Sequence, residues 1–161
     1  MVDSDMIDVY VQPGESHLVQ EPALMRTLLG SCVGIAFWAP DAGVGALCHP
    51  MLPRYPHKKP LDPLDARRYV DYAIHDLAAV LDELRVPRHE IQVKLFGGAD
   101  VLALPRHGNK RPTVGKMNSD MALQVLEQEG FRIVASKLGG TSGINLQFNT
   151  ETGEVWVRQL N

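Results

Sequence analysis

The segment VGIAFW at residues 33–38, the turn PDAG at residues 40–43 and the segment VGALCH at residues 44–49 together predict a β-hairpin. The two outer segments are mostly apolar and have the length of strands. Proline, aspartate and glycine between them are typical of a tight turn. We therefore expect two antiparallel neighbouring strands in this part of the chain.

The position of the turn predicts how the two strands pair. With the turn centred between Asp41 and Ala42, the numbers of paired residues sum to about 83. Cys32 then pairs with Met51, and His49 lies diagonally across from Cys32 on the same face. A shift of the register by one residue would turn His49 to the other face, so the proximity of these two side chains depends on the register.

Further strands are predicted outside this hairpin. Residues 7–11 alternate, residues 91–95 and 133–138 are rich in β-branched and apolar side chains, and the Glu-Thr-Gly turn at residues 151–153 predicts a terminal hairpin. Strands dominate the pattern and two substantial helices lie between them. The sequence therefore predicts an α+β fold.

The two helices are marked by their start and stop signals. The first begins at Asp62-Pro63, carries its apolar residues on one face and ends before Pro87. The second is expected to be capped by Asn118 or Ser119 and to run through Glu129.

Length and composition limit the classes of protein to be considered. The chain has 161 residues, 45% apolar and 22% charged, with a formal charge of −3. This balance argues against a dedicated nucleic-acid or anionic-membrane binder. No segment has the ~20 apolar residues of a membrane helix, and the acidic N-terminus does not look like a signal peptide. We expect one domain, residues 1–161, with residues 1–14 as a loosely attached N-terminal strand or tail.

Two cysteines cannot build a disulfide framework, so the expected location is the reducing cytoplasm. Cys32, Cys48 and His49 are possible zinc ligands, but the chain has no Cys-x-x-Cys pair, and a structural zinc site usually has four ligands. The sequence therefore indicates no metal site, and it implies no cofactor.

Cys32 is the strongest candidate for a catalytic residue. It follows Gly30 and Ser31, and a glycine-containing turn at the start of a strand can present a thiol together with free backbone N–H groups for an oxyanion. An adjacent imidazole, from His49, can hold such a thiol as the reactive thiolate. The alternative is that Cys32 is a small core residue, as a cysteine in a strand usually is. Cys48 alternates with His49 and is interpreted as core.

The glycine pairs Gly97-Gly98 and Gly139-Gly140 match no phosphate-binding motif. Both follow predicted strands, so we interpret them as tight turns with close backbone packing. The loop that contains Gly139, Gly140, Thr141 and Ser142 is a candidate border of a substrate cleft, since it offers N–H and hydroxyl donors to an amide.

The chain contains the motifs LGSCVG at residues 29–34 and VGALCHPMLP at residues 44–53. It also contains RYVD at 68–71, FGGA at 96–99, VGKMN at 114–118, GGTSG at 139–143 and FNTETG at 148–153. From about Glu15 to Leu160, these motifs together resemble the CheD family, the chemoreceptor glutamine deamidases of bacterial chemotaxis.

This resemblance implies a fold like the deamidase domain of cytotoxic necrotizing factor toxins, a β-sandwich core of mixed sheets with helices packed outside. It implies an amidohydrolase that converts glutamine side chains on the cytoplasmic helices of methyl-accepting chemotaxis proteins to glutamate and ammonia. Some members of the family also remove methyl esters from receptor glutamates, and some bind a CheC-type phosphatase.

The resemblance also implies a catalytic set of cysteine, histidine and an upstream threonine. The first two correspond to Cys32 and His49. The threonine is expected six residues before the cysteine, where Arg26 stands here, so we assign Thr27 on the assumption that the turn is one residue shorter. Gly30 and Ser31 are expected to shape the turn and the oxyanion site.

Two other functions remain to be separated from catalysis. The first is a non-catalytic adaptor with a CheD-like fold that binds a CheC-type phosphatase or receptor tails; it would need neither Cys32 nor His49. The second is a nucleotide-binding regulatory domain built on the glycine pairs, which a nucleotide titration would reveal.

Overall fold

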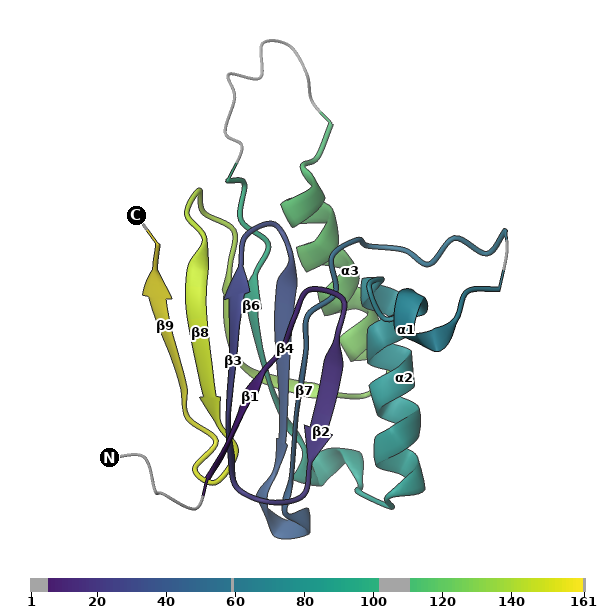
Figure 1. The fold of residues 1–161 in the computed structure, drawn as a ribbon. Coiled ribbons are helices and arrows are strands. Elements are labelled where there is room, and N and C mark those ends of the chain that lie inside the picture. The colour runs from purple at the N-terminus through teal and green to yellow at the C-terminus, as the bar shows by residue number, and fades with distance from the viewer. Residues whose placement is uncertain (1–5, 59, 102–110, 161) are drawn as a thin grey trace.

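Two mixed β-sheets face each other in the computed structural model, and helices cover the outer face of one sheet (Figure 1). The structure describes residues 6–58, 60–101 and 111–160. The strands are β1 (Ile7–Tyr10), β2 (Ser16–Val19), β3 (Ala23–Leu29), β4 (Val33–Ala39), β5 (Val44–Cys48), β6 (Gln92–Gly97), β7 (Arg132–Leu138), β8 (Ile144–Asn149) and β9 (Val155–Gln159). The helices are α1 (Pro63–Ala66), α2 (Val70–Glu83) and α3 (Val114–Gln128), with short 3₁₀ turns η1 (Pro40–Ala42) and η2 (Arg88–Glu90).

The strand order confirms the predicted fold class. The first sheet has the order β1-β3-β8-β9, and the second has the order β2-β5-β4-β6-β7. The pairs β1–β3 and β6–β7 are parallel, whereas the other neighbours are antiparallel. The molecule is thus an α+β fold with two mixed sheets.

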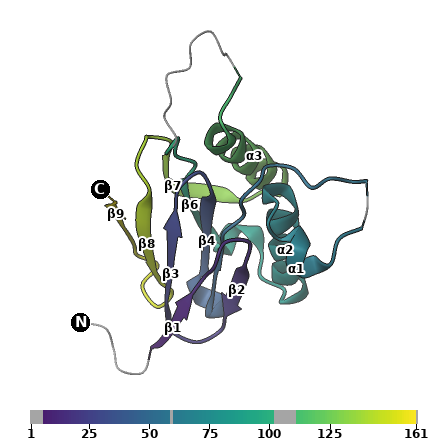
Figure 2. The ribbon, with the colours of Figure 1, turned by 45° about the horizontal axis from the view of Figure 1, so that its top comes forward.

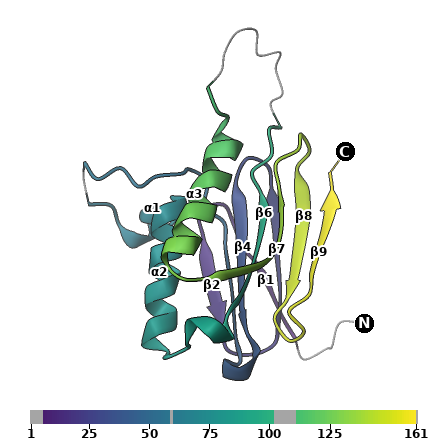
Figure 3. The same cartoon turned by 180° about the vertical axis from the view of Figure 1, so that it is seen from behind.

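The apolar core has two layers, one on each face of the second sheet. Between the sheets, side chains of β3 and β8 such as Met25, Leu146 and Phe148 pack against β4 and β5. On the other face, β4 and β6 pack against α2 and α3, which lie side by side in Figure 3. Because β4 and β5 are buried on both faces, their sequences are nearly continuous apolar segments rather than alternating ones.

The register of the central hairpin is confirmed. Ile35 pairs with Cys48 and Ala39 with Val44, so the paired residue numbers sum to 83, as expected from the turn. The same alignment continues past the strand ends, where Val33 N donates to the Pro50 carbonyl at 3.3 Å. Position 43 needs a left-handed backbone (φ +66°), which glycine adopts without steric cost.

The first predicted helix is in fact two helices. Asp62 caps α1 as expected, accepting a hydrogen bond from Leu64 N. The helix then stops because Tyr69 is extended and forms a parallel bridge with Leu52. Val70 N donates to the Leu52 carbonyl at 2.8 Å, which ties the chain after His49 to the start of α2.

The second helix begins earlier than predicted. Thr113, whose side chain accepts from Lys116 N, is the N-cap of α3. Asn118 and Ser119 therefore do not cap the helix but lie inside it, both buried. The predicted cap at Asn118 or Ser119 is wrong, because Thr113 is a competing cap residue earlier in the chain.

The N-terminal strand is present and is integrated into the fold within the described residues. The strand β1 pairs in parallel with β3, and Val11 is fully buried. Neither β2 nor β3 is evident as a strand from the sequence pattern, although β3 contributes to the core between the sheets. Within the described residues, none of the helices combines the length and the hydropathy needed to cross a bilayer.

Candidate active site

The turn with residues 30–32 connects the two sheets, because it joins the end of β3 to the start of β4. In Figure 1 this turn lies at the upper end of the strands, and Figure 2 brings that end toward the viewer. The end of β6, the turn after β7 and the first turns of α3 lie at the same end (Figure 1). Three separate parts of the chain can therefore contact residues 30–32.

Cys32 and Cys48 lie on opposite faces of the hairpin, as the alternation predicted. Cys32 is partly exposed and packs against the core between the two sheets. Cys48 is fully buried in the core beneath the helices, which confirms its interpretation as core. The two thiols cannot share a metal ion from opposite faces, and in the described part of the chain no three His, Cys, Asp or Glu side chains form a metal-binding group.

His49 is held by its backbone on both sides. Its N–H donates to the Glu15 carbonyl at 2.9 Å, and its carbonyl accepts from Gly14 N at 2.7 Å. The ring points into the space between the sheets, and the whole residue is only 1% exposed. The segment that precedes β2 therefore positions this histidine.

Thr27 contacts the His49 ring directly. Its hydroxyl oxygen lies 2.6 Å from His49 Nδ1 and 2.7 Å from the Val11 carbonyl oxygen. A carbonyl only accepts, so the single hydroxyl proton goes to Val11 and Nδ1–H of His49 donates to Thr27. In the neutral ring, Nε2 then carries the free lone pair.

The structure thus distinguishes Thr27 from its neighbour. Arg26 points away from the space between the sheets and forms an ion pair with Asp8 at 2.7 Å. Thr27 lies on the inner face of β3, where it is fully buried against His49. Of the two positions that the resemblance left in question, only Thr27 touches the histidine.

The electrostatics of the two groups favour a neutral pair at rest. Burial lowers the pKa of His49 from its ordinary 6.5 to about 4, and the Val11 carbonyl offsets only part of that effect. Burial also raises the pKa of Cys32, while the N–H of Cys32 itself acts in the opposite direction. His49 Nε2 has no hydrogen-bond partner among the described residues. Burial penalises both charges, so it favours a neutral thiol and a neutral imidazole over the expected imidazolium–thiolate pair.

Three hydrogen bonds hold the backbone of the turn. The Gly30 carbonyl accepts from Ala99 N at 2.9 Å, and the Cys32 carbonyl accepts from Gly98 N at 2.8 Å. A Cβ on Gly97, which has φ +105°, would collide with the Cys32 carbonyl oxygen. The first glycine pair is thus a tight turn with close backbone packing, as interpreted.

The third hydrogen bond comes from Asn118, which the sequence pattern did not indicate. Asn118 is fully buried, and its Nδ2 donates to the carbonyls of Ser31 and Met51, each at 2.9 Å. A signal for this position was present: Asn118 shares a helix face with Ala122 and Val125, which are buried. A polar residue on that face needs buried partners.

The second glycine pair borders a small cavity beside the turn. A cavity of about 100 Å³ is lined by Gly30 together with Gly139, Gly140 and Ser142. Thr141, the remaining candidate of this loop, is exposed and does not line it. Gly139 N donates to the Gly97 carbonyl at 2.9 Å, so the loop after β7 is fixed against the end of β6.

Two solved structures share the fold at low sequence identity. Bacillus licheniformis hypothetical protein YfiH matches with a TM-score of 0.50 and 9% identity, over 79% of this chain and 51% of that one. A Neisseria meningitidis protein of the DUF152 family matches with a TM-score of 0.50 and 11% identity, over 85% of this chain and 65% of that one. At such identities the likeness concerns the fold alone.

Sequence relatives are much closer. The family model described as CheD chemotactic sensory transduction matches residues 51–159. A Geobacter sulfurreducens protein named probable chemoreceptor glutamine deamidase CheD 2 is 39% identical, over 95% of this chain and 90% of that protein. A Maridesulfovibrio salexigens protein named probable chemoreceptor glutamine deamidase CheD is 36% identical, over 98% of this chain and 94% of that protein. The match to the family model over most of the chain, extended by these relatives to nearly all of it, shows that this chain belongs to the CheD family.

Proposed function

We propose that this protein is a chemoreceptor glutamine deamidase that acts in the cytoplasm on glutamine side chains of methyl-accepting chemotaxis proteins. The relatives at 39% and 36% identity carry that activity in their names. The observation that carries the proposal is the free Nε2 of a buried His49, anchored through Nδ1 by Thr27, on the same face of the hairpin as Cys32.

In this proposal the reaction starts from a neutral thiol and a neutral imidazole. Cys32 Sγ attacks the carbonyl carbon of the glutamine side chain while His49 Nε2 takes the thiol proton. The tetrahedral intermediate collapses as His49 returns that proton to the leaving nitrogen, which departs as ammonia. A water molecule then attacks the thioester, His49 again accepts a proton and passes it to the sulfur, and glutamate and the free thiol are released.

The proposed roles follow from the contacts of each residue. Thr27 fixes the tautomer of His49, so that Nε2 is the base. Gly30 and Ser31 shape the turn, and the N–H groups of Ser31 and Cys32 are the proposed oxyanion donors. Gly139, Gly140 and Ser142 border the cavity next to Gly30 and are proposed to contact the substrate, with Thr141 at the exposed rim.

The proposed partners are the cytoplasmic helices of chemoreceptors and a CheC-type phosphatase. The alternative, a non-catalytic adaptor for the same partners, has no use for a histidine buried with a free ring nitrogen. Burial of an unpaired polar atom costs stability, and a binding module gains nothing from it.

The test is incubation with a chemoreceptor cytoplasmic fragment, followed by peptide mass spectrometry. We expect the mass increase of amide-to-acid conversion at defined glutamines with the wild-type protein and none with Cys32→Ala. The matched control is Cys48→Ala, which should retain the activity because that thiol faces the helices. Binding of the fragment without any conversion by the wild type would contradict the proposal and favour the adaptor.

A further inference from the structure

All three backbone carbonyl groups of the turn at residues 30–32 accept hydrogen bonds from other parts of the chain. Gly30 O is bonded to Ala99 N, Ser31 O to Asn118 Nδ2, and Cys32 O to Gly98 N. In a trans peptide the carbonyl and the following N–H point in opposite directions. Fixing the Ser31 carbonyl toward α3 therefore fixes the N–H of Cys32 away from α3.

Among the described residues that N–H has no hydrogen-bond acceptor, so it can bind another group. Among the hydrogen bonds of the described residues, none has the N–H of Ser31 or Cys32 as its donor. The N–H of Cys32 also belongs to the same residue as the thiol. It is thus the backbone donor next to the atom that would attack a substrate carbonyl.

Asn118 holds the Ser31 carbonyl in this orientation through hydrogen bonds of its side-chain amide. Both hydrogens of its Nδ2 are used, one by Ser31 O and the other by Met51 O. Met51 lies two residues after His49, and the hairpin alignment places it opposite Cys32. One buried amide therefore joins the segment that carries the thiol to the segment that carries the imidazole. Its Oδ1 has no partner among the described residues, which makes the residue a poor choice for stability alone.

We propose that Asn118 is a positioning residue, which holds the Ser31 carbonyl so that the N–H of Cys32 is aimed at the oxygen of the tetrahedral intermediate. This inference rests on the proposed deamidase function. A donor oriented in advance stabilises charge that develops only as the thiol attacks. Asn118 should therefore affect kcat rather than substrate binding.

The test compares two reactions of the same thiol. Deamidation passes through an oxyanion, whereas alkylation by iodoacetamide displaces iodide and forms none. In Asn118→Ala we expect kcat for a receptor fragment to fall by about 10- to 100-fold, with KM within about twofold. The rate constant for alkylation of Cys32 should stay within about twofold of the wild type, because nucleophile and base remain in place.

The matched control is Ser119→Ala. Ser119 is the next residue of α3, is also buried and donates to Gly115 O within its own helix. We expect the kcat of Ser119→Ala to stay within about twofold of the wild type, since Ser119 donates to no carbonyl of the turn at residues 30–32. An unchanged kcat in Asn118→Ala would overturn the inference, as would a parallel loss of kcat and alkylation, which indicates a merely structural role.

A second measurement needs no substitution and covers the case in which Asn118→Ala does not fold. The chain has only two cysteines, so ¹⁵N-cysteine labelling yields one amide signal for Cys32 and one for Cys48. A receptor peptide with an aldehyde in place of the glutamine amide adds to the thiol and forms an oxyanion-like hemithioacetal. We expect the Cys32 amide proton to shift downfield and that of Cys48 to stay unchanged. Adduct formation without a Cys32 shift would overturn the inference, whereas a wild type that forms adducts but deamidates nothing would count against the proposed function instead.

Discussion

Thr27 uses one hydroxyl group for two contacts, to the Val11 carbonyl and to His49 Nδ1. Replacing it with valine keeps the shape but leaves both partners without a hydrogen bond. We expect Thr27→Val to lower kcat by about 10-fold or more, because the ring loses the contact that selects its tautomer. Thr27→Ser keeps the hydroxyl and should retain most of the rate.

Deamidation of a receptor fragment by the two variants measures this effect. Some activity should remain in Thr27→Val, above that of Cys32→Ala, since the nucleophile is still present. Full activity in the valine variant would remove Thr27 from the mechanism and leave a Cys32–His49 dyad.

The two cysteines should differ strongly in reactivity. Cys32 is partly exposed, whereas Cys48 is fully buried, and thiol alkylation requires access. We expect iodoacetamide to label Cys32 alone in the folded protein. Because burial raises the pKa of Cys32, the labelling rate should keep rising with pH above the ordinary thiol value of about 8.5.

Peptide mapping after timed labelling measures both rates, and labelling in denaturant is the control in which the two thiols should react equally. Equal rates in the folded protein, or a plateau of the Cys32 rate below pH 8, would contradict this account of the site.

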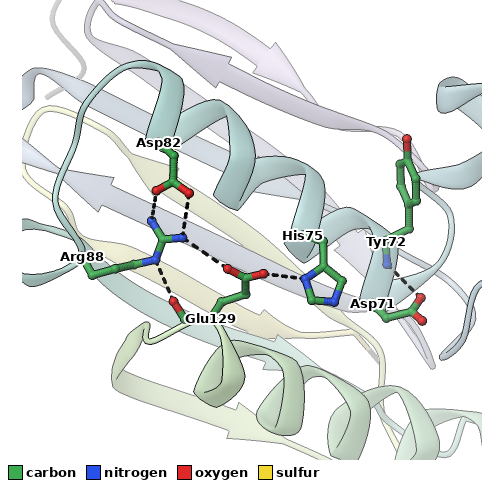
Figure 4. Close-up of polar contacts among 6 residues, drawn as sticks. All are labelled: Asp71, Tyr72, His75, Asp82, Arg88 and Glu129. Atoms are coloured by element: carbon green, nitrogen blue, oxygen red, sulfur yellow. Dashed lines mark hydrogen bonds and ion pairs between the residues drawn. The ribbon is translucent and has the colours of Figure 1, made fainter.

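At the scale of elements, Arg88 joins the ends of α2 and α3. Its guanidinium pairs with Asp82 at 2.8 Å and donates to the Glu129 carbonyl at 2.7 Å (Figure 4). It also lies 4.4 Å from the Phe131 ring centroid. Glu129 in turn contacts His75 of α2 at 2.6 Å. This network closes the helix layer at the end far from the turn at residues 30–32 (Figure 1).

We expect Arg88→Met to lower the free energy of unfolding by about 1–3 kcal/mol, because the helix-end carbonyl and two carboxylates lose a partly buried, charged donor. Chemical denaturation measures the change. Lys116→Met is the control: its pair with Asp120 on α3 is exposed, so its loss should cost less than about 0.5 kcal/mol. Deamidase activity of the folded Arg88→Met protein should be unchanged, and equal costs for the two variants would contradict the proposed role of the network.

At the scale of the whole molecule, the candidate site depends on the packing of the two sheets against each other. Thr27 belongs to one sheet, the hairpin that leads to His49 belongs to the other, and the turn with Cys32 crosses between them. Separation of the sheets would therefore hydrate the His49 ring and break its contact with Thr27. The stability of the sandwich and the protonation of His49 are consequently linked.

The sign of this linkage follows from the pKa of His49, about 4 in the folded state against an ordinary 6.5. Between these values the unfolded chain binds the proton more tightly, so the free energy of unfolding falls as the pH is lowered from 6.5 to 4. The contribution is fully present above pH 6.5 and amounts to about 3 kcal/mol. Urea denaturation at several pH values should show this loss in the wild type.

His49→Gln cannot take up that proton, so the difference between the two proteins isolates the histidine from the carboxylates that titrate in the same range. We expect the variant to be less stable at pH 7 but to lose less stability on acidification. Parallel curves for both proteins would show that His49 is not buried in its neutral form.

Local sequence periodicity was sufficient for the central hairpin. Alternation has a period of two residues, and the turn fixes the pairing, so the opposite orientations of Cys32 and Cys48 and the register could be predicted without the rest of the fold. The tight turn at residues 97–98 could likewise be predicted from its two glycines, because tight turns depend on local backbone conformation.

Contacts between distant parts of the chain decided the rest. The break between α1 and α2 arises from pairing of Leu52 with Tyr69, and no local sequence pattern predicts this break. The choice of Thr27 over Arg26 depends on which face of β3 meets the other sheet, and the low pKa of His49 depends on burial between the sheets. The role of Asn118 does not follow from the local sequence, because its partners, Ser31 and Met51, lie far away in the sequence. The sequence by itself determined the two strands of the central hairpin and the register that puts Cys32 and His49 on one face, since these follow from local periodicity and from the turn. Only the tertiary structure decided which polar groups orient Cys32 and His49, because these groups lie far apart in the sequence and meet only in the folded chain.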